Sequence, residues 1–520
     1  MAEIAEHIRK ETLDKDLDKF ATVEVATNLV ARRLVAPGFG LLFLALTAVL
    51  TAIYVSGEPG AIAIVAAAAI GAYMALNIGA NDVANNVGPA VGAKAMTMIG
   101  ALVIAAIFEA AGALIAGGDV VSTISKGIVS PESLSDSGVF VRLMIAALIS
   151  SALWVNLATW IGAPVSTTHS VVGGVLGAGV TAAGFAAVNW QVMGAIATSW
   201  VISPVMGGVI AALFLAFIKA FIIYQDDKIA AARRWVPLLI ALMAGSFTIY
   251  LAIKGLSQLV HLANSTVLML GAAAFLAVWA LSSAYVARQS KGMENRNQSL
   301  RKLFNLPLII SAALLSFAHG ANDVANAVGP VAAIVGAARS GSVASAVAVP
   351  LWVMLIGAIG ISLGLLLFGP RLIRMVGEQI TRLNPMRAFC VALSAALTVI
   401  VASWLGLPVS STHIAVGAVF GVGFFREWYT AKSKRRRAYM ERKYARQRAE
   451  REASGSAVLR TAMDEAELEE EAEPISREEA IRRRLVRRVH VTTIVATWVT
   501  TVPASALLAA AVFLGLSALV

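Results

Sequence analysis

GANDVANNVGP at residues 79–89 returns as GANDVANAVGP at residues 320–330, with ten of the eleven positions identical. Each copy places an aspartate, Asp82 or Asp323, in strongly apolar surroundings. On the insertion scale, an aspartate at the centre of a membrane helix costs about 2.5–3.5 kcal/mol. Because so costly a residue recurs in the same setting, we interpret the two copies as parts of a functional site.

The composition around these phrases is that of an integral membrane protein. Of the 520 residues, 58% are hydrophobic and 14% are charged, and the mean hydropathy is +0.77. A soluble globular protein carries about 25% charged residues. Apolar runs of about 20 residues recur, each long enough to cross a hydrocarbon core of about 30 Å, and they lack the alternation of a membrane β-barrel. The sequence therefore predicts an all-α polytopic membrane protein.

The net charge of +11 comes from Lys and Arg residues that lie between the hydrophobic runs. The positive-inside rule explains that distribution better than a nucleic-acid partner does, so we expect no binding of nucleic acid. The lone cysteine, Cys390, provides no disulfide framework. We expect a multi-pass protein of the cell inner (plasma) membrane, in contact with the lipid bilayer.

A second phrase is also repeated, WIGAPVSTTH at residues 160–169 and WLGLPVSSTH at residues 404–413. Its copies lie 244 residues apart, against 241 for the first phrase, so the chain contains an internal duplication. The order of apolar segments places the two copies of the first phrase in opposite orientations. The sequence thus predicts an inverted-topology repeat of about 12 transmembrane helices with discontinuous or re-entrant segments. Because glycine and proline interrupt helices, we expect spans to end inside the first phrase, near residues 80 and 320.

The expected organisation has six parts. They are an N-terminal amphipathic cytoplasmic segment (1–35), a first transmembrane repeat (36–225), a linker with an extra span (226–262), a second transmembrane repeat (263–425), a charged cytoplasmic insert (426–490) and a final transmembrane helix that completes the second repeat (491–520). For the insert, two interpretations stay open, a solvated loop that touches anionic lipid headgroups and a regulatory domain.

The chemistry of the phrases suits an oxyanion together with a cation. A helix that starts after Pro164 or Pro408 presents N–H groups and its positive dipole end to an anion. Hydroxyl donors follow at each start, namely Ser166, Thr167, Thr168, Ser410, Ser411 and Thr412. Hard oxygen ligands suited to sodium come from the first phrase, namely Asp82, Asn81, Asn85, Asp323, Asn322 and Asn326. An aspartate faces a bound anion only if a cation lies between them or the anion is protonated, so we expect coupled transport.

Less specific interpretations stay open for several of these residues. A single Ser or Thr in a membrane helix is commonly a packing residue. His169 and His413 either line a cavity as neutral groups or relay protons. Glu109, a lone acid within a span, is either a coupling residue or a structural partner of a nearby polar group.

Signatures of enzymes are absent from the sequence. GPAVGAK at residues 88–94 fails the spacing and ending of a phosphate-binding P-loop. There is no G-x-S-x-G elbow and no H-E-x-x-H pair. We therefore predict that the chain is not an enzyme and takes no cofactor, only a co-transported Na⁺ or H⁺.

On both GANDVAN phrases and both PVS[ST]TH phrases, the chain resembles the inorganic phosphate transporter (Pit) family of sodium- or proton-coupled phosphate symporters. The resemblance implies phosphate held near the midplane between two inverted halves, in a protein that is often a homodimer. By motif match, Asp82 and Asp323 would hold the coupling ion and help to hold phosphate. The same match implies that a set of amides lines this centre, Asn81, Asn85, Asn322 and Asn326. It also implies that hydroxyls bind the phosphate oxygens, those of Ser166, Thr167, Thr168, Ser410, Ser411 and Thr412.

We therefore expect a secondary active symporter that imports inorganic phosphate by alternating access around a midplane site. The GAND wording is similar to the branch regarded as sodium-coupled, which favours Na⁺ over H⁺. A sulfate symporter of the same family, a non-transporting phosphate sensor and an anion channel stay open as alternatives.

Overall fold

The structure is a computed structural model of the 520-residue chain. It describes residues 34–129, 133–134, 136–161, 165–255, 260, 262–341, 349–379, 383–434, 436–439, 441–442, 445 and 488–519. The expected N-terminal segment, apart from its last two residues, and most of the expected charged insert lie outside the described residues.

The described elements are helical, as the composition predicted. They comprise a first helix Leu34–Tyr54 and then α2 (Ala61–Gly92), α3 (Met98–Ala116), α4 (Gly118–Ser122), η1 (Thr123–Gly127), α5 (Ser137–Ile161), α6 (Thr167–Ala183), η3 (Phe185–Ala187), α7 (Trp190–Ile218), η4 (Lys219–Ile223), α8 (Lys228–Lys254), α9 (Asn264–Gln289), α10 (Asn297–Leu303), α11 (Asn305–Ser340), α12 (Leu351–Gln379), α13 (Pro385–Trp404), α14 (Ser411–Lys432) and α18 (Arg488–Ala518). Within the described part, eleven helices are long and apolar enough to cross a membrane. The fold class is thus confirmed as an all-α polytopic membrane protein.

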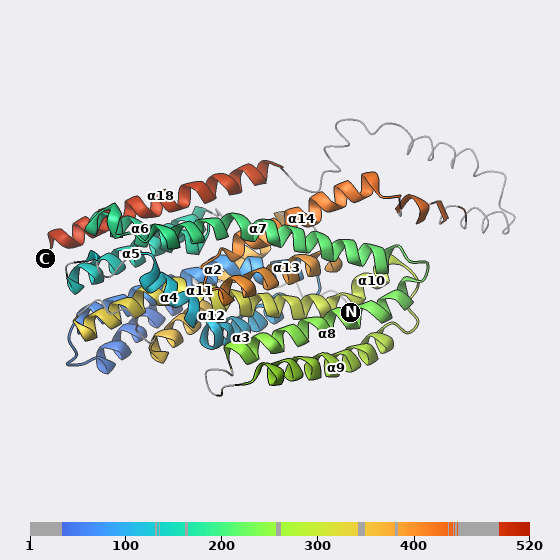
Figure 1. Ribbon diagram of the computed structural model, residues 1–520, viewed down its shortest axis with the longest axis horizontal. Coiled ribbons are helices and arrows are strands. Elements are labelled where there is room, and N and C mark those ends of the chain that lie inside the picture. Colours follow the sequence, from blue (N-terminus) through green and yellow to red (C-terminus); the bar gives the residue numbers. More distant parts are fainter. Residues whose placement is uncertain are drawn as a thin grey trace, which may run out of the picture.

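The long helices run side by side, with α8 and α9 along one edge and α18 along the opposite edge (Figure 1). Burial follows this order, because 89% of the most apolar window of α11 is buried, against 17% for α9. A helix that is apolar on all sides suits either a core or a lipid contact. Helix α11 is therefore the central element, and α9 leaves most of its surface exposed at the edge of the chain.

The two copies of the first phrase lie on antiparallel helices, α2 and α11. Along α2, Gly60 lies against Ala338, Gly71 against Val331, and Asp82 against His319. As residue numbers rise on α2, those of the contacted residues on α11 fall. The inverted relation that the repeat predicted is therefore present where the two phrases meet.

Close glycine contacts on α2 and α11 fix how the halves correspond. A Cβ at Gly79 would meet the backbone oxygen of Ile361 on α12, and one at Gly320 would meet that of Glu109 on α3. Small residues let membrane helices approach this closely. Because Gly79 and Gly320 are equivalent positions of the repeated phrase, Ile361 and Glu109 are equivalent as well.

The last helix of each half packs on the other half. Helix α7 packs along α14, where a Cβ at Gly421 would meet the backbone of Gly208. Helix α18 packs along α6, where a Cβ at Gly177 would meet the backbone of Ala506. The two halves are thus interleaved.

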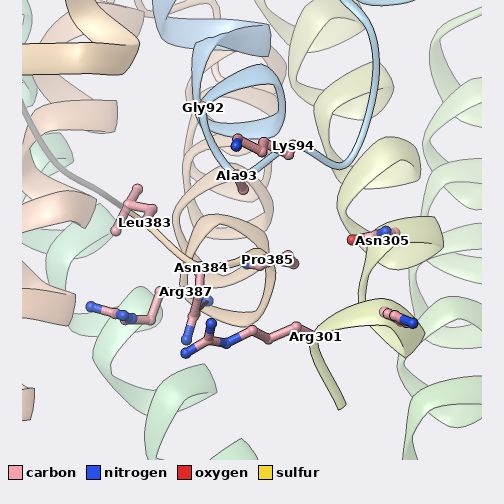
Figure 2. Close-up of a pocket in the computed structure, with 10 residues that line it drawn as sticks. Gly92, Ala93, Lys94, Arg301, Asn305, Leu383, Asn384, Pro385 and Arg387 are labelled. Atoms are coloured by element: carbon pink, nitrogen blue, oxygen red, sulfur yellow. Dashed lines mark hydrogen bonds between the residues drawn. The ribbon is translucent and has the colours of Figure 1, made fainter. Parts of the chain in front are cut away.

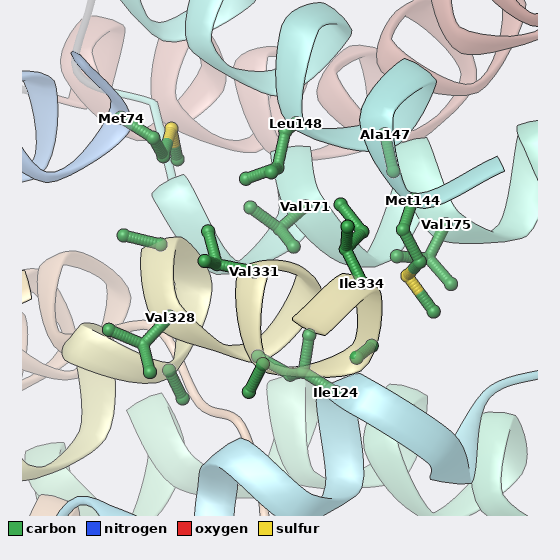
Figure 3. Close-up of a cluster of buried hydrophobic side chains, with 14 of the residues drawn as sticks. Met74, Ile124, Met144, Ala147, Leu148, Val171, Val175, Val328, Val331 and Ile334 are labelled. Carbon is green, nitrogen blue, oxygen red and sulfur yellow. The ribbon is translucent and has the colours of Figure 1, made fainter. Parts of the chain in front are cut away.

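A buried apolar cluster joins the halves beside the repeated phrases. Figure 3 shows Val331 and Ile334 of α11 beside Leu148 of α5 and Val171 of α6. All four side chains are at most 2% exposed. Burial of a valine or leucine side chain contributes about 1.5–3 kcal/mol, so this cluster holds α11 firmly against the first half.

The expectation that spans end inside the first phrase, near residues 80 and 320, was wrong. Both phrases lie inside continuous helices, α2 and α11, with Pro89 and Pro330 within them. Neighbouring helices can compensate for the hydrogen bond that a proline removes from a membrane helix. The breaks occur instead at the second phrase, immediately before α6 and α14.

Candidate functional site

The site begins at the two helix starts that follow the breaks. Ser166 and Ser410 have extended backbones and cap α6 and α14, with their hydroxyls accepting from the N–H of His169 at 3.1 Å and of His413 at 3.3 Å. A serine favours this position because its oxygen satisfies a donor that the first turn leaves unpaired. The local sequence therefore fixes both helix starts in the same way.

Asparagines of the first phrase bind the helix start of the opposite half. The Asn85 amide donates to the Thr412 hydroxyl at 2.9 Å. In the equivalent contact, the Asn326 amide donates to the Thr168 hydroxyl at 3.1 Å. These reciprocal bonds place both phrases and both helix starts in one centre.

The two aspartates lie in that centre and are each 1% exposed. Asp82 accepts hydrogen bonds from the hydroxyl of Thr167 at 3.2 Å and from that of Thr412 at 2.8 Å. Asp323 accepts from the Ser411 hydroxyl at 3.0 Å. Each carboxylate thus contacts the first turn of its own half, and Asp82 also contacts that of the other half.

The remaining asparagines of the first phrase bind the backbone at the breaks. The Asn81 amide donates to the carbonyl of Val165 at 3.1 Å. The Asn322 amide donates to the carbonyl of Leu407 at 3.2 Å, and its oxygen accepts from the N–H of Val409 at 3.2 Å. Buried backbone groups require such partners, so these two side chains stabilise the irregular segments that carry the hydroxyl groups.

His319 is a member of the site that sequence reasoning missed. Its Nε2 lies 2.9 Å from a carboxylate oxygen of Asp323 and 3.7 Å from one of Asp82. Its Nδ1 lies 3.3 Å from Glu109, which also accepts from the Asn86 amide at 2.8 Å. One imidazole therefore connects both aspartates to Glu109, and all five side chains are at most 1% exposed.

Two signals in the sequence point to this network. His319 immediately precedes the second copy of the phrase and lies one helical turn before Asp323. Asn86 is the single mismatch between the two copies, where the second copy has Ala327. A departure from an otherwise identical repeat thus marked a residue of this buried network.

The other two histidines of interest form a separate ring cluster. The rings of His169 and His413 lie 4.5 Å apart, and that of His169 lies 3.8 Å from Trp200. The Trp200 indole donates to the carbonyl of Pro408 at the break before α14. These histidines therefore pack the two helix starts together, on Trp200 of α7.

The centre is rich in buried negative charge. Three carboxylates, those of Asp82, Glu109 and Asp323, surround one imidazole. Among the described residues, the two buried lysines, Lys219 and Lys228, lie elsewhere, over aromatic rings. If all three carboxyl groups are ionised, the group keeps a negative charge even with a protonated His319, and an unbalanced buried charge is costly. This geometry suits a small cation.

Donor atoms for such a cation are already close together. One oxygen of Asp82, one of Asp323 and a ring nitrogen of His319 lie within 4.8 Å of one another. Oxygens that accept no hydrogen bond within the described part of the chain are also available there, namely Oδ1 of Asp323 and Oδ1 of Asn326. The centre can therefore bind a cation without first breaking bonds to these two oxygens.

Comparison with known proteins gives a consistent picture. Residues 78–509 match a family described as the phosphate transporter family. A Helicobacter pylori (strain J99) protein named "Putative phosphate permease" is 46% identical over 522 residues, covering 95% of this chain and 97% of its own. A Pyrococcus abyssi protein with the same description is 40% identical over 360 residues, covering 69% and 87%. A solved structure described as "The sodium-dependent phosphate transporter" matches with a TM-score of 0.74 and 33% identity, over 88% of this chain and all of that one.

Proposed function

This chain belongs to the phosphate transporter family, and on that premise we propose that it is a secondary active symporter that imports inorganic phosphate together with Na⁺. The family is one of transporters rather than enzymes. The chain itself is a multi-pass membrane protein with eleven candidate spans among its described residues. Coupling, direction and mechanism are the parts that we propose.

The buried carboxylates are the observation that carries the coupling. Two unit charges 4 Å apart interact by about 4 kcal/mol at an effective dielectric constant of 20. A phosphate dianion beside Asp82 and Asp323 would therefore be repelled by several kcal/mol. A cation bound between them attracts the dianion and offsets part of that repulsion, so phosphate and cation bind best together.

We assign the sodium ligands to the carboxylates and amides of the first phrase. They are Asp82, Asn85, Asp323 and Asn326. Support comes from the buried oxygens of Asp323 and Asn326 that accept no hydrogen bond from the described residues. The sodium dependence in the description of the solved relative also favours Na⁺.

We assign phosphate to the two convergent helix starts. Helix N-termini bind anions through free N–H groups and the positive end of the dipole. The hydroxyls that would bind phosphate are those of Ser166, Thr167, Thr168, Ser410, Ser411 and Thr412. In this proposal Asn81 and Asn322 act mainly by holding the breaks that expose these groups, and the bonds of both amides to backbone carbonyls support that role.

The remaining polar residues have supporting roles. Glu109 acts through His319, because its carboxyl oxygen lies 3.3 Å from Nδ1 of that imidazole. His169 and His413 act as packing between the helix starts, which the contact between the two rings and the edge contact of His169 with Trp200 support. Alternating access follows from rocking of the two interleaved halves around the shared centre. The homodimer that the resemblance implied stays a prediction, and light scattering of the purified protein would test it.

Radiolabelled phosphate uptake into proteoliposomes tests this function. We expect accumulation with an inward sodium gradient, little with an inward proton gradient, and no competition from unlabelled sulfate. Accumulation driven only by protons would replace Na⁺ with H⁺ at the same carboxylates. Competition by sulfate would change the substrate, and binding without accumulation under either gradient would contradict the symporter.

A further inference from the structure

A second polar feature lies at the end of α2, away from the centre. Figure 2 shows a pocket there, between the end of α2, the end of α10, the start of α11 and the start of α13. Its volume is about 390 Å³. Its lining includes Lys94, which follows Asp82 by twelve positions. Helix α2 ends at Gly92, ten positions after Asp82, so at 1.5 Å of rise per residue its end is about 15 Å from Asp82 along the helix axis. The pocket is therefore separate from the proposed transport site.

The pocket has a strong excess of positive charge. Four of its ten lining residues are cationic, Lys94, Arg301, Lys302 and Arg387, and none is acidic. Within the described part of the chain, none of the four forms an ion pair. Such a concentration of like charge repels itself unless an anion binds. The lining residues therefore provide no negative charge that would balance the four cations.

The helix that begins in the pocket adds to this charge. Asn384 caps α13 and accepts from the N–H of Arg387 at 3.0 Å, so the positive end of a 20-residue helix points into the same space. The Arg387 side chain is half-buried there. Arginine and lysine together with a helix start are the groups that recognise phosphate oxygens.

Lys94 stands in a conformation that side chains rarely adopt. Its φ is +58°, and it is the sole residue other than glycine with a positive φ among the described residues. It occupies the position after the α2 C-cap, where a glycine is the usual residue. A lysine here costs conformational energy that glycine would avoid, so its presence runs against the local backbone preference.

The duplicated fold does not require this pocket. At the equivalent positions of the other half, Lys94 corresponds to Val335 and Arg387 to Leu143, which are 1% and 0% exposed. Asn384 likewise corresponds to Phe140, which is 2% exposed. These three positions lie inside α11 and α5 rather than at helix ends, with Arg142 one position before Leu143, so the helix ends that form the pocket have no counterpart in the other half.

We propose that this pocket binds a phosphate-bearing anion, at a site distinct from the transport centre. The shared ligand chemistry is the phosphate oxyanion, which free inorganic phosphate or the headgroup of an anionic phospholipid supplies. The volume lies within the range of small-molecule sites. The positive-inside rule places the basic segment Arg288–Lys302 on the cytoplasmic side, so the ligand reaches the pocket from the cytoplasm or from the inner leaflet.

Binding of radiolabelled inorganic phosphate to the full chain in phosphatidylcholine nanodiscs, in sodium-free buffer, tests the free-anion source. We expect one sodium-independent site per chain, weakened at least tenfold in R301Q/K302Q, whose two side chains are exposed. The matched control is R288Q/K291Q, which removes two exposed cations from the same link outside the pocket. It should bind as the unmodified chain does.

The lipid source is tested with nanodiscs that contain phosphatidylglycerol. Native mass spectrometry should then show phosphatidylglycerol retained by the unmodified chain and by R288Q/K291Q, and lost from R301Q/K302Q. Either ligand pattern supports the pocket. Equal binding of both ligands by the two double variants would overturn it. Sodium-driven uptake, measured on the same variants, reports separately on the transport function.

A variant at Lys94 separates binding from folding. K94G removes the charge and relieves the positive φ, so the midpoint of thermal unfolding should stay the same or rise. Anion binding should nevertheless weaken at least threefold. Unchanged binding in K94G together with unchanged binding in R301Q/K302Q would reject the site.

Discussion

The two halves of the central site share one set of polar groups, which we call the cradle, but differ in what surrounds it. The cradle comprises Asp82, Asp323, Asn85, Asn326 and the hydroxyl groups at the two helix starts. Thr167 and Ser411 each donate to the aspartate of their own half. Asn85 and Asn326 each donate to the equivalent threonine of the opposite half. Around this symmetric cradle, the second half provides His319 where the first has Ile78. Two further pairs differ in the same way, Glu109 with Ile361 and Asn86 with Ala327.

All three polar members of these pairs lie in one network on one side of the cradle. Their counterparts are apolar and at most 1% exposed. A symmetric inverted repeat would give its two aspartates equal surroundings, whereas this network attaches a third carboxylate and an imidazole beside them. Duplication thus explains the aspartates, hydroxyls and amides, and the departures from it add a carboxyl group and an imidazole on one side only.

Removing either aspartate should have the largest effect on transport. Asp82→Asn and Asp323→Asn each keep the side-chain volume but remove a charge that the proposed sodium site needs. We expect sodium-driven phosphate uptake in proteoliposomes to fall to the level of empty liposomes for both. Asp119→Asn, which removes an exposed carboxylate paired with Lys254, is the control and should transport normally. Near-normal uptake in both cradle variants would contradict the paired-carboxylate site.

Replacing Glu109 by the residue of its counterpart tests the asymmetric network. Glu109→Ile removes the acceptor of the Asn86 amide and the ion-pair partner of His319, and loss of one partner of a buried ion pair costs about 3–5 kcal/mol. We expect a lower thermal midpoint in detergent together with reduced uptake. Glu109→Gln retains an acceptor for Asn86 and should lose less stability. Equal midpoints for Glu109→Ile and the unmodified chain would mean that the network is dispensable.

The features that could be predicted from the sequence are those that the two halves share. Repetition identified Asp82 and Asp323, and the second phrase, with Pro164 and Pro408, predicted where both helix breaks occur. His319 has no partner in the repeat, so a search for repeated polar residues passed over it. The exchange of α7 and α18 between the halves depends on contacts such as Gly421 with Gly208, which spacing along the chain does not encode. Pro89 and Pro330 were misread because tertiary packing tolerates them inside α2 and α11.

The two threonines at equivalent helix starts should differ in their effects. Thr412 donates to the Asp82 carboxylate at 2.8 Å, whereas Thr168 donates to the neutral carbonyl of Val409 at 2.9 Å. A hydrogen bond to a charged group contributes about 1.5–3 kcal/mol, against about 0.5–1.5 kcal/mol for a neutral one. Thr412→Val should therefore raise the sodium concentration for half-maximal uptake about 10- to 100-fold, and Thr168→Val about 10-fold or less. The reverse order would show that the helix starts are not distinguished by their acceptors.

The smallest difference is expected between the two exchanged helix seams, because there the halves remain alike. A Cβ at Gly421 would meet the backbone of Gly208 on α7, and one at Gly177 would meet that of Ala506 on α18. Overpacking of this kind costs about 1–3 kcal/mol. Gly421→Ala and Gly177→Ala should therefore lower the thermal midpoint in detergent by similar amounts, while Gly194→Ala, with no heavy atom within 4 Å of its Cβ, is the control for the loss of a glycine. A drop in one seam variant alone would mean that the two exchanged helices are held unequally, and that the asymmetry of the molecule extends beyond the network around His319.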